Sequence, residues 1–584
     1  MSDNKDPENQ IQKEKFSEAD AGDGTKVYEQ FLTGVPFFMC FIACFISLFL
    51  IGLDQTIVMT ILVTVGEKFN AYDKVSWLST GYLLTMCIFA ATWGRVSITF
   101  GRKYSFITAV VLFEAGSLMC ALSQNINVLI GGRVLAGIGG GGVQTLAFVV
   151  ASEITTIDKR SLVFSIFGVA LSVSSVCGPL IGGAFTENVS WRWCFYINLP
   201  LGGLAVLALF FFLKPPPAKG TLKEKLKKLD YVGTFLFMVA IVLLLLALSF
   251  GGVQFPWKSG VVISFFVLSF LFCIAFGLWN FKLSHAPIIP YELVITLGVL
   301  LPVSALFLVF FCFMGSVLYL TTYFQIVNNA NPLSTGVHLL PLILGITVSS
   351  LGSGFLMRGT RYIKPFAIVG SIFGACGLGS ITLLNQYSSR GEKIGLLILP
   401  GLAIGCLLQT GMMSAQISAP KKTGATILTT SFFNFSRALG GSIGSDLAQT
   451  IFNSSYKSAV KKGASKLSGV LTEAEIISIA SKPDQLHALD DETRDIIVTW
   501  IMHSIRNVFI SSTSLMCLCV VLCCLFSNKR LPSATEVKTK EDYEAELKEQ
   551  NSKRLDKNYS NNDEEKDPEL IEVEHEISNN ETQR

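Results

Sequence analysis

The stretch Gly178-Pro179-Leu180-Ile181-Gly182-Gly183 lies near the end of one long apolar segment, and Trp191-Arg192-Trp193-Cys194-Phe195-Tyr196-Ile197-Asn198-Leu199-Pro200 begins the next. A Gly-Pro pair inside an apolar helix removes one backbone donor and one side chain at a single point. Neighbouring helices must then satisfy the freed backbone and pack against the bend. We therefore expect a bundle of membrane-spanning helices in which this segment bends or packs tightly.

Composition supports the membrane interpretation. Hydrophobic residues make up 51% of the chain and charged residues 15%, whereas soluble domains typically contain about 25% charged residues. The apolar residues form blocks of roughly 20, the length that crosses about 30 Å of hydrocarbon as a helix. The sequence thus predicts an all-α polytopic membrane protein.

Fourteen apolar blocks are predicted to be spans, and an even number places both termini on one side of the membrane. Their ranges are 37–64, 77–98, 104–123, 127–151, 161–186, 193–213, 231–251, 260–281, 298–324, 335–357, 365–385, 394–416, 424–452 and 506–527. The loops after even-numbered spans contain far more Lys and Arg than the short loops after odd-numbered spans. Because basic loops stay in the cytosol, both termini are predicted to be cytosolic.

The predicted organisation has six parts. They are a cytosolic N-terminal tail (1–36), an N-terminal six-helix bundle (37–213), a cytosolic basic linker (214–230), two extra transmembrane helices (231–281), a C-terminal six-helix bundle (282–527) with an outer loop (453–505), and a cytosolic tail (528–584). Both tails are polar and rich in mixed charge, which is typical of disordered segments. Within the outer loop, residues 471–477 are predicted to form a short amphipathic helix.

Signals of enzymatic chemistry are absent from the sequence. It has no G-x-x-x-x-G-K-[ST] phosphate loop, no H-E-x-x-H pair and no C-x-x-C pair, so we predict neither an enzyme nor a metal site. Its fourteen cysteines lie in or beside apolar spans, which does not suggest a disulfide framework. The net charge of +3 is too small to indicate nucleic-acid binding.

Several elements together resemble one family. They are Leu53-Asp54-Gln55-Thr56-Ile57-Val58, Trp77 to Leu84, Gly94 to Lys103, Leu129 to Gly137, Gly168 to Gly183, and the W-R-W-x-F-x-I-N-L-P run. Over roughly residues 35–530 the chain resembles the fourteen-span drug:proton antiporters of the major facilitator superfamily, in their fungal branch. The resemblance implies two six-helix halves, alternating access, and a substrate site between the halves near the midplane. It also implies that a proton gradient supplies the energy, with no cofactor.

The same resemblance implies a set of gating residues. They are Gly94, Arg95, Gly101, Arg102 and Lys103 in the cytoplasmic element, and Gly178, Pro179, Gly182 and Gly183 in the antiporter element. The cytoplasmic element usually contains an acid where this chain has Ile98. We therefore expect Arg95, Arg102 and Lys103 to bind helix ends or other acids.

Charged residues inside the predicted spans are candidates for proton coupling, because a charge near the bilayer centre costs at least about 2.5 kcal/mol. Asp54 and Arg133 both fall in the outer half of one bundle, so we expect an ion pair or a shared water. Glu114 lies near the midplane, where it either couples protons or binds a cation, or else simply bonds a neighbouring helix. Asp446 is expected to face a cavity or another charge rather than lipid.

Uncharged polar residues give weaker candidates. His338 is either a proton carrier or a packed, hydrogen-bonded side chain. Gln144, Gln325 and Gln409 either line a substrate cavity or bond neighbouring helices. Two glycosylation sequons, at Asn188 and Asn453, lie on the predicted outer side close to the membrane.

The resulting functional prediction is a proton-coupled antiporter that exports amphipathic or cationic organic compounds. A vacuolar carrier of basic amino acids, with the same fold, is the alternative, because fold does not fix the cargo. A transporter-like nutrient sensor is a third reading, for which a large cytosolic signalling domain would be expected. We expect residence in the plasma membrane, with the vacuolar membrane as the alternative. The expected partners of the monomer are a small-molecule substrate, protons and the lipid bilayer, without nucleic acid.

Overall fold

Long helices make up most of the described chain. The computed structural model describes residues 16, 20, 27–71, 74–215, 220–252, 254–330, 332–463, 472, 475–477, 486, 489–533, 535–537 and 542. The chain divides into two units, one of residues 18–533 and one of residues 1–17 with 534–584. In the smaller unit, Phe16 and Val537 form an isolated β-bridge. The predicted helix at 471–477 and both predicted tails fall largely outside the described residues.

The first half of the larger unit contains six long helical segments after a short 3-10 turn, Val27–Gln30. They are α1 (Gly34–Phe69), α2 (Trp77–Phe100), α3 (Arg102–Ala121), α4 (Ile126–Ile154), α5 (Ile157–Asn188), and the pair α6 (Trp193–Tyr196) and α7 (Asn198–Phe212). A short helix, α8 (Leu222–Lys227), then precedes α9 (Tyr231–Phe250) and α10 (Gly260–Leu278), which continues as the π-helical η4 (Trp279–Leu283).

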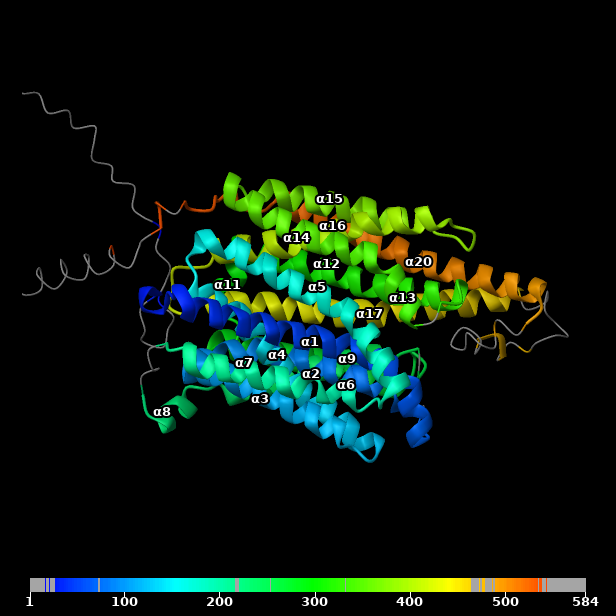
Figure 1. Cartoon of the computed structure of the whole chain (residues 1–584), viewed down its shortest axis with the longest axis horizontal. Coiled ribbons are helices and arrows are strands. Elements are labelled where there is room, and N and C mark those ends of the chain that lie inside the picture. Colours follow the sequence, from blue (N-terminus) through cyan, green and yellow to red (C-terminus); the bar gives the residue numbers. More distant parts are fainter. Residues whose placement is uncertain are drawn as a thin grey trace, which may run out of the picture. The chain divides into compact units, whose positions relative to one another are not determined.

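The second half begins with the short α11 (Tyr291–Ile295). Its further elements are α12 (Leu297–Thr322), the π-helical η5 (Tyr323–Val327), α13 (Pro332–His338), α14 (Leu340–Thr360), α15 (Lys364–Ile381), α16 (Arg390–Ile417), α17 (Ala425–Gly463) and α20 (Asp491–Cys524). In Figure 1 the long helices of this unit run side by side, with α3 and α15 on opposite sides of the bundle.

Local sequence explains several helix starts. The side chains of Asn125, Asp230 and Asp490 accept hydrogen bonds from the first turns of α4, α9 and α20. Ser389 and Glu392 form a reciprocal capping box at the start of α16. Such caps satisfy backbone donors that the helix itself leaves unpaired.

Thirteen helical segments of the described chain are long and apolar enough to cross a membrane. The fourteenth long helix, α17, is not apolar enough to be counted among them, although it has 39 residues. It packs against α2, α12, α16 and α20, so protein rather than lipid surrounds much of its surface. A helix in that position can contain Ser, Asn and Gly without exposing them to hydrocarbon.

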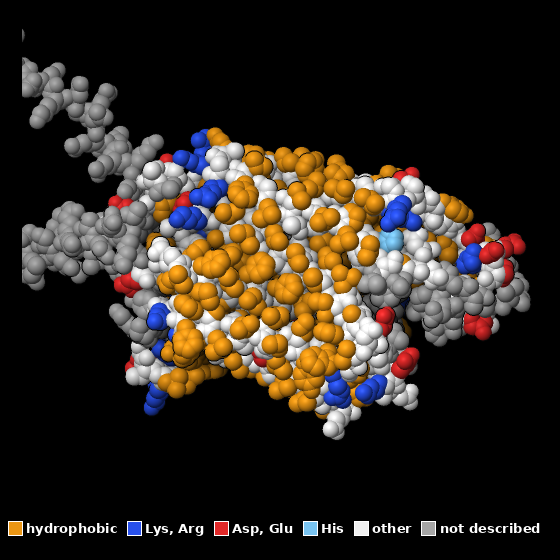
Figure 2. Space-filling view, in the orientation of Figure 1, with side chains coloured by type: hydrophobic (Ala, Val, Ile, Leu, Met, Phe, Trp, Pro, Cys, Tyr) orange, Lys and Arg blue, Asp and Glu red, His pale blue; other side chains and the backbone are white. Residues whose placement is uncertain are grey.

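The outside of the larger unit fits a bilayer. Figure 2 shows hydrophobic side chains over the middle of one face of this unit, whereas Lys, Arg, Asp and Glu gather toward the two ends. The α10 helix is the most lipid-facing candidate span, since only 11% of its most apolar window is buried. This distribution is expected where hydrocarbon covers the middle of a helical bundle.

The predicted spans match the helices closely, with three differences. The sixth predicted span, 193–213, is interrupted at Ile197, between α6 and α7. The tenth predicted span, 335–357, is interrupted at Leu339, so that His338 ends the separate helix α13 instead of lying inside a span. The outer loop predicted at 453–505 is shorter, because α17 continues to Gly463 and α20 already begins at Asp491. The extra turns of α17 are polar, and α20 opens with the charged run Asp491 to Asp495, so hydropathy alone ends the first helix too early and begins the second too late.

Candidate functional site

Arg133 of α4 and Asp54 of α1 form a buried ion pair, as the sequence predicts. Arg133 Nη1 lies 2.6 Å from Asp54 Oδ2, and the two side chains are 1% and 0% exposed. Arg133 Nε also donates to the Leu78 carbonyl at 3.0 Å, and its guanidinium lies over the Tyr82 ring, 4.2 Å from the centroid. Three groups on α1 and α2 therefore fix one guanidinium.

Asn198, the first residue of α7, connects the pair to α3. Its Nδ2 lies 3.4 Å from Asp54 Oδ1 and 3.1 Å from Ser117 Oγ. Both Asn198 and Ser117 are completely buried. The site thus joins α1, α3, α4 and α7 through polar contacts inside the first half.

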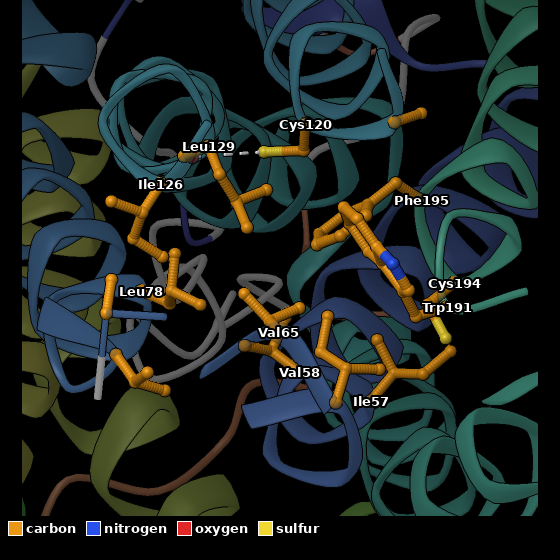
Figure 3. Close-up of a cluster of buried hydrophobic side chains, with 14 residues drawn as sticks. Ile57, Val58, Val65, Leu78, Cys120, Ile126, Leu129, Trp191, Cys194 and Phe195 are labelled. Atoms are coloured by element: carbon orange, nitrogen blue, oxygen red, sulfur yellow. Dashed lines mark hydrogen bonds between the residues drawn. The ribbon is translucent and has the colours of Figure 1, made fainter. Parts of the chain in front are cut away.

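An apolar cluster covers this pair on the side away from the Arg102 end of α3. Its buried members include Ile57, Val58 and Val65, which follow Asp54 on α1, and Leu129, which precedes Arg133 on α4. Figure 3 shows these side chains converging on one another, with Cys120 and Phe195 beside Leu129. The cluster separates the ion pair from the predicted outer surface.

Because both side chains are buried, each charge of this pair depends on the other. Breaking a buried ion pair by removing one charge is costly, on the order of 3–5 kcal/mol, because the other charge is left uncompensated. Protonating Asp54 removes its charge and leaves the Arg133 guanidinium without its ionic partner.

The basic residues of the cytoplasmic element bind other groups, as the absence of an acid at Ile98 predicts. Arg102, the first residue of α3, donates Nε and Nη2 to the Glu153 carboxylate near the end of α4, at 2.6 to 2.9 Å. Lys103 Nζ donates to the Phe210 carbonyl at 2.6 Å. We call this end of the bundle, where Arg102 lies, the predicted cytosolic end.

Arg95 has a partner in a different part of the chain. Its Nε and Nη2 donate to the Pro287 carbonyl at 3.0 and 2.8 Å. Pro287 lies in the loop between η4 and α11, and Asn280 holds that loop by accepting from Ile288 N at 3.0 Å and donating to Ile289 O at 2.7 Å.

Asp230, at the start of α9, forms hydrogen bonds with the loop that contains Pro287 and with η4, which precedes that loop. Its carboxylate accepts hydrogen bonds from Gly233 N, Trp279 Nε1 and Ser284 Oγ at 2.6 to 2.9 Å. Helix α9 packs against both α2 and α17. The two extra helices therefore connect directly to the cytoplasmic element rather than lying apart from the two halves.

Hydrogen bonds join the two halves toward the predicted cytosolic end. Ser161 Oγ of α5 donates to the Gly354 carbonyl of α14 at 3.3 Å, and Ser350 Oγ of α14 donates to the Ser165 carbonyl of α5 at 3.2 Å. The two helices are so close that a Cβ added at Gly354 would lie 1.9 Å from Ser165 Oγ.

Gln409 of α16 reinforces this junction. Its Nε2 donates to the Phe164 carbonyl at 2.8 Å and lies 3.0 Å from Ser350 Oγ. On the other pair of helices, a Cβ at Gly94 of α2 would lie 2.0 Å from Ser431 Oγ of α17. The described conformation thus has its two halves in tight contact at this end.

Of the remaining polar candidates, His338 and Gln325 lie on the neighbouring elements α13 and η5, whereas Gln144 lies on α4 and Asp446 on α17. His338 Nδ1 lies 2.7 Å from the Ser334 carbonyl oxygen, and its ring stacks on Phe324 with centroids 4.8 Å apart. Gln144 is buried on α4, whereas Gln325 is partly exposed in η5. Asp446 is half-buried on α17, and no described residue forms a hydrogen bond or ion pair with its carboxyl group.

Helix α5 continues through the Gly178-Pro179 pair without interruption. A Cβ at Gly178 would lie 2.0 Å from Thr56 Oγ1, and one at Gly182 would lie 2.3 Å from Thr60 Oγ1, whereas Gly183 has open space. Gly178 and Gly182 thus allow α5 to approach α1 closely. Gly101, between α2 and α3, has a φ of 92°, a backbone conformation that favours glycine.

The two sequon asparagines occupy different settings. Asn188 is exposed at the end of α5, where its Nδ2 donates to the Ala184 carbonyl at 2.9 Å. Asn453 lies within α17 and is half-buried. The described residues contain no group of three or more His, Cys, Asp and Glu side chains that could hold a metal ion.

Sequence reasoning missed several residues of this site. Asn198 belongs to the motif W-R-W-x-F-x-I-N-L-P, which marks it as unusual but does not place it against Asp54. Glu153 precedes a basic loop, so charge pairing could have suggested it as a partner for Arg102. Pro287 acts through its carbonyl oxygen, which leaves no signal in the sequence.

The family model for the Major Facilitator Superfamily matches residues 44–445. The chain belongs to this superfamily of membrane transporters, which accounts for its helix arrangement. It is 33% identical to "Vacuolar basic amino acid transporter 5" of Saccharomyces cerevisiae, over 87% of this chain and 94% of that protein. It is 30% identical to "Azole resistance protein 1" of the same yeast, over 86% and 90%.

A solved structure supports the fold. The crystal structure of the human organic anion transporter MFSD10 matches with a TM-score of 0.54 and 14% identity, and the match covers 84% of this chain and 100% of that one. At this identity the likeness concerns the fold alone. The sequence prediction of an all-α major facilitator fold is confirmed.

Proposed function

We propose that this chain is a proton-coupled antiporter that exports amphipathic or cationic organic compounds by alternating access. The observation that carries the proposal is the buried pair of Asp54 and Arg133, in which a titratable acid neutralises a cation inside a membrane bundle. Intramembrane charges of this kind mark ion and proton pathways. The proton gradient supplies the energy, and no cofactor is involved.

Alternating access requires contacts between the halves that can form and break. The hydrogen bonds between α5 and α14 are suited to this role, because each joins a serine hydroxyl to a backbone carbonyl and needs little rearrangement to exchange with water. Proton release from Asp54 restores its pair with Arg133. The resulting cycle exchanges protons moving inward for substrate moving outward.

The relatives support two cargoes. Resistance to azoles, named in one relative, favours an apolar or amphipathic drug. A basic amino acid, named in another relative that matches 94% of its own length, favours a vacuolar carrier of lysine or arginine. The second candidate keeps the same proton chemistry, because antiport into an acidic vacuole and export across an acidified plasma membrane use equivalent gradients.

Transport by the purified protein in proteoliposomes distinguishes the two candidate cargoes. Purified full-length protein in proteoliposomes receives an imposed pH gradient with either radiolabelled tetraphenylphosphonium or radiolabelled arginine as the probe. We expect gradient-driven accumulation of tetraphenylphosphonium that Asp54→Asn abolishes and Glu187→Gln leaves intact, since Glu187 is an exposed acid at the end of α5. Accumulation of arginine alone would establish the second cargo instead. Transport that Asp54→Asn leaves unchanged would refute the coupling role.

The cellular location follows from the same choice. Drug export requires the plasma membrane with both termini in the cytosol, whereas amino-acid storage requires the vacuolar membrane. A fluorescent tag on the full chain, imaged with a vacuolar dye, distinguishes these locations. We expect plasma-membrane fluorescence and a functional monomer.

A further inference from the structure

Glu114 is an acid of α3 that takes no part in the Asp54–Arg133 pair. Both of its carboxyl oxygens are buried, and neither has a hydrogen-bond partner among the described residues. The carboxyl group lies against the backbone of α7, because a Cβ built at Gly202 would be 1.8 Å from Glu114 Oε1. Gly202 thus leaves the space that this carboxyl occupies.

The surroundings of Glu114 contain no cation paired with it. The titratable and charged side chains on α3 and on the helices that pack against it are Arg102, Lys103, Tyr104 and Cys120 on α3; Tyr82, Cys87 and Arg95 on α2; Arg133 and Glu153 on α4; and Cys194 and Tyr196 on α6. Helix α7 contributes none. Arg133 binds Asp54, Arg102 binds Glu153 and Arg95 binds Pro287.

A carboxyl group in this position is stable in its protonated form. An unpaired carboxylate away from water is costly, whereas the neutral acid avoids most of that cost. Like charges repel, so negative charge on Asp54 disfavours negative charge on Glu114. The two acids are therefore coupled without direct contact.

Two successive contacts between α3 and α7 lie beside these acids. Ser117 and Asn198 form the first contact, in which Asn198 Nδ2 donates to both Ser117 Oγ and Asp54 Oδ1. Glu114 and Gly202 form the second, three residues back on α3 and four residues further on α7. About one helical turn, roughly 5.4 Å, separates the two contacts, and Glu114 lies nearer the predicted cytosolic end.

We propose that Glu114 is a second proton-binding site, on the cytosolic side of Asp54. It exchanges its proton with Asp54 along the side chains of Ser117 and Asn198, which lie between the two acids. A proton leaves the Asp54 carboxyl group and joins the Glu114 carboxylate, so the net charge of the two acids is unchanged. The proton path then runs between α3 and α7, apart from a substrate site between the two halves. This inference rests on the proton-coupled transport proposed above.

The first test detects the proton itself and does not depend on transport. Infrared pH-difference spectra of the full-length protein in proteoliposomes report the C=O stretch of a protonated carboxyl group. We expect Glu114→Gln to remove one such band and Gly203→Ala to keep it, because Gly203 on the same helix has open space around its Cβ. A spectrum of Glu114→Gln identical to the wild type would overturn the proposal.

The second test separates coupling from packing. With tetraphenylphosphonium as the probe, we expect Glu114→Gln to lower pH-driven transport at least ten-fold, while exchange of labelled for unlabelled probe without a gradient continues. Gly202→Ala, which displaces the carboxyl group, is expected to act in the same direction, and Gly203→Ala to behave as wild type. Loss of both activities in Glu114→Gln would indicate packing alone and would contradict the proposal.

Failure of the proposed function gives a different result. A wild-type protein that moves no probe against a pH gradient would refute proton-coupled export, whereas the infrared band would still decide whether Glu114 binds a proton. Glu114→Asp provides the conservative variant, since it keeps a carboxyl group on a shorter side chain. We expect it to restore the infrared band and part of the pH-driven transport.

Discussion

Asp54 receives a short hydrogen bond from Arg133 on one oxygen, at 2.6 Å, and a longer one from Asn198 on the other, at 3.4 Å. The two contacts respond differently to a proton. Protonation of Asp54 removes the ionic attraction to Arg133, whereas the neutral amide of Asn198 keeps a polar contact with the protonated acid. Asn198 is therefore expected to hold the Asp54 side chain in place while Arg133 moves.

Removing the charges of this pair singly and together is expected to give non-additive effects on stability. Arg133→Gln alone leaves a buried carboxylate unpaired and should destabilise the protein by several kcal/mol, about 3–5 by analogy with other buried pairs. Asp54→Asn in the same chain should recover much of that loss, because no uncompensated charge remains. Thermal unfolding of the three variants in detergent measures this coupling, and strictly additive losses would contradict it.

The exposed pair of Glu292 and Lys422 predicts a pH dependence outside the membrane. Lys422 Nζ lies 2.5 Å from Glu292 Oε1, and the hydrogen bond from Lys422 lowers the pKa of Glu292 from its ordinary value of 4.5. A lowered pKa in the folded state means that the pair stabilises the fold above that ordinary value. The stabilisation is lost as the pH falls through the folded pKa.

The measurement compares wild type with Glu292→Gln. Because both side chains are well exposed, the difference in unfolding free energy should be at most about 1 kcal/mol near neutral pH. It should vanish in acid, where the wild-type carboxylate is also neutral, and shrink in high salt, which screens exposed charges. A difference that persists unchanged in acid would rule out this ion pair as its source.

Asn280 is expected to control the loop that presents the Pro287 carbonyl to Arg95. Asn280→Leu keeps a similar side-chain size but loses both hydrogen bonds to the loop, to Ile288 N and Ile289 O. An unsatisfied buried backbone group costs about 1–3 kcal/mol, so the loop should open more often. Hydrogen exchange should then rise at residues 284–290 and at the end of α2 that contains Arg95.

Ser264→Ala provides the control for this experiment. Ser264 lies on the exposed face of α10 and bonds only within its own helix, to the Val261 carbonyl. Its replacement should leave exchange in the loop unchanged. Unaltered exchange in Asn280→Leu would show that the loop does not depend on the Asn280 contacts.

The sequence predicts those features that follow from counting along a helix. Asp54 and Arg133 come at matching depths in spans of opposite direction, which is enough to predict their pairing. The departure at Ile98 likewise predicts that Arg102 binds a helix end or another acid, although it does not identify Glu153. These inferences need only span ends and directions, which hydropathy and basic loops supply.

Other features depend on which faces of two helices meet. The contact of Asn198 with Asp54 requires the rotation of α7 about its axis, and nothing in the local sequence gives that rotation. The polar extension of α17 to Gly463 depends on its packing against other helices, so hydropathy ends it too early. The sequence likewise does not reveal which backbone carbonyls, such as that of Pro287, will accept side-chain hydrogen bonds.

Gly354 is expected to determine whether the two halves can close at the predicted cytosolic end. A Cβ there would lie 1.9 Å from Ser165 Oγ and 2.9 Å from the Ser161 carbonyl oxygen, a backbone atom that cannot simply turn away. Overpacking of this kind typically costs about 1–3 kcal/mol. Gly354→Val should therefore destabilise the closed contact of α5 with α14 and favour conformations that are open at this end.

A pair of cysteines reports the shift. With cysteines introduced at Ser161 and Arg358, one on α5 and one a turn beyond Gly354 on α14, the rate of cross-linking by a short bifunctional reagent measures how often this end is closed. Gly354→Val should slow cross-linking several-fold and lower transport to a similar degree, whereas Gly352→Ala, on the same helix with open space around its Cβ, should change neither. Equal cross-linking in Gly354→Val and Gly352→Ala would mean that the closed contact tolerates a side chain at Gly354, and the close approach of α5 and α14 would then have no part in gating.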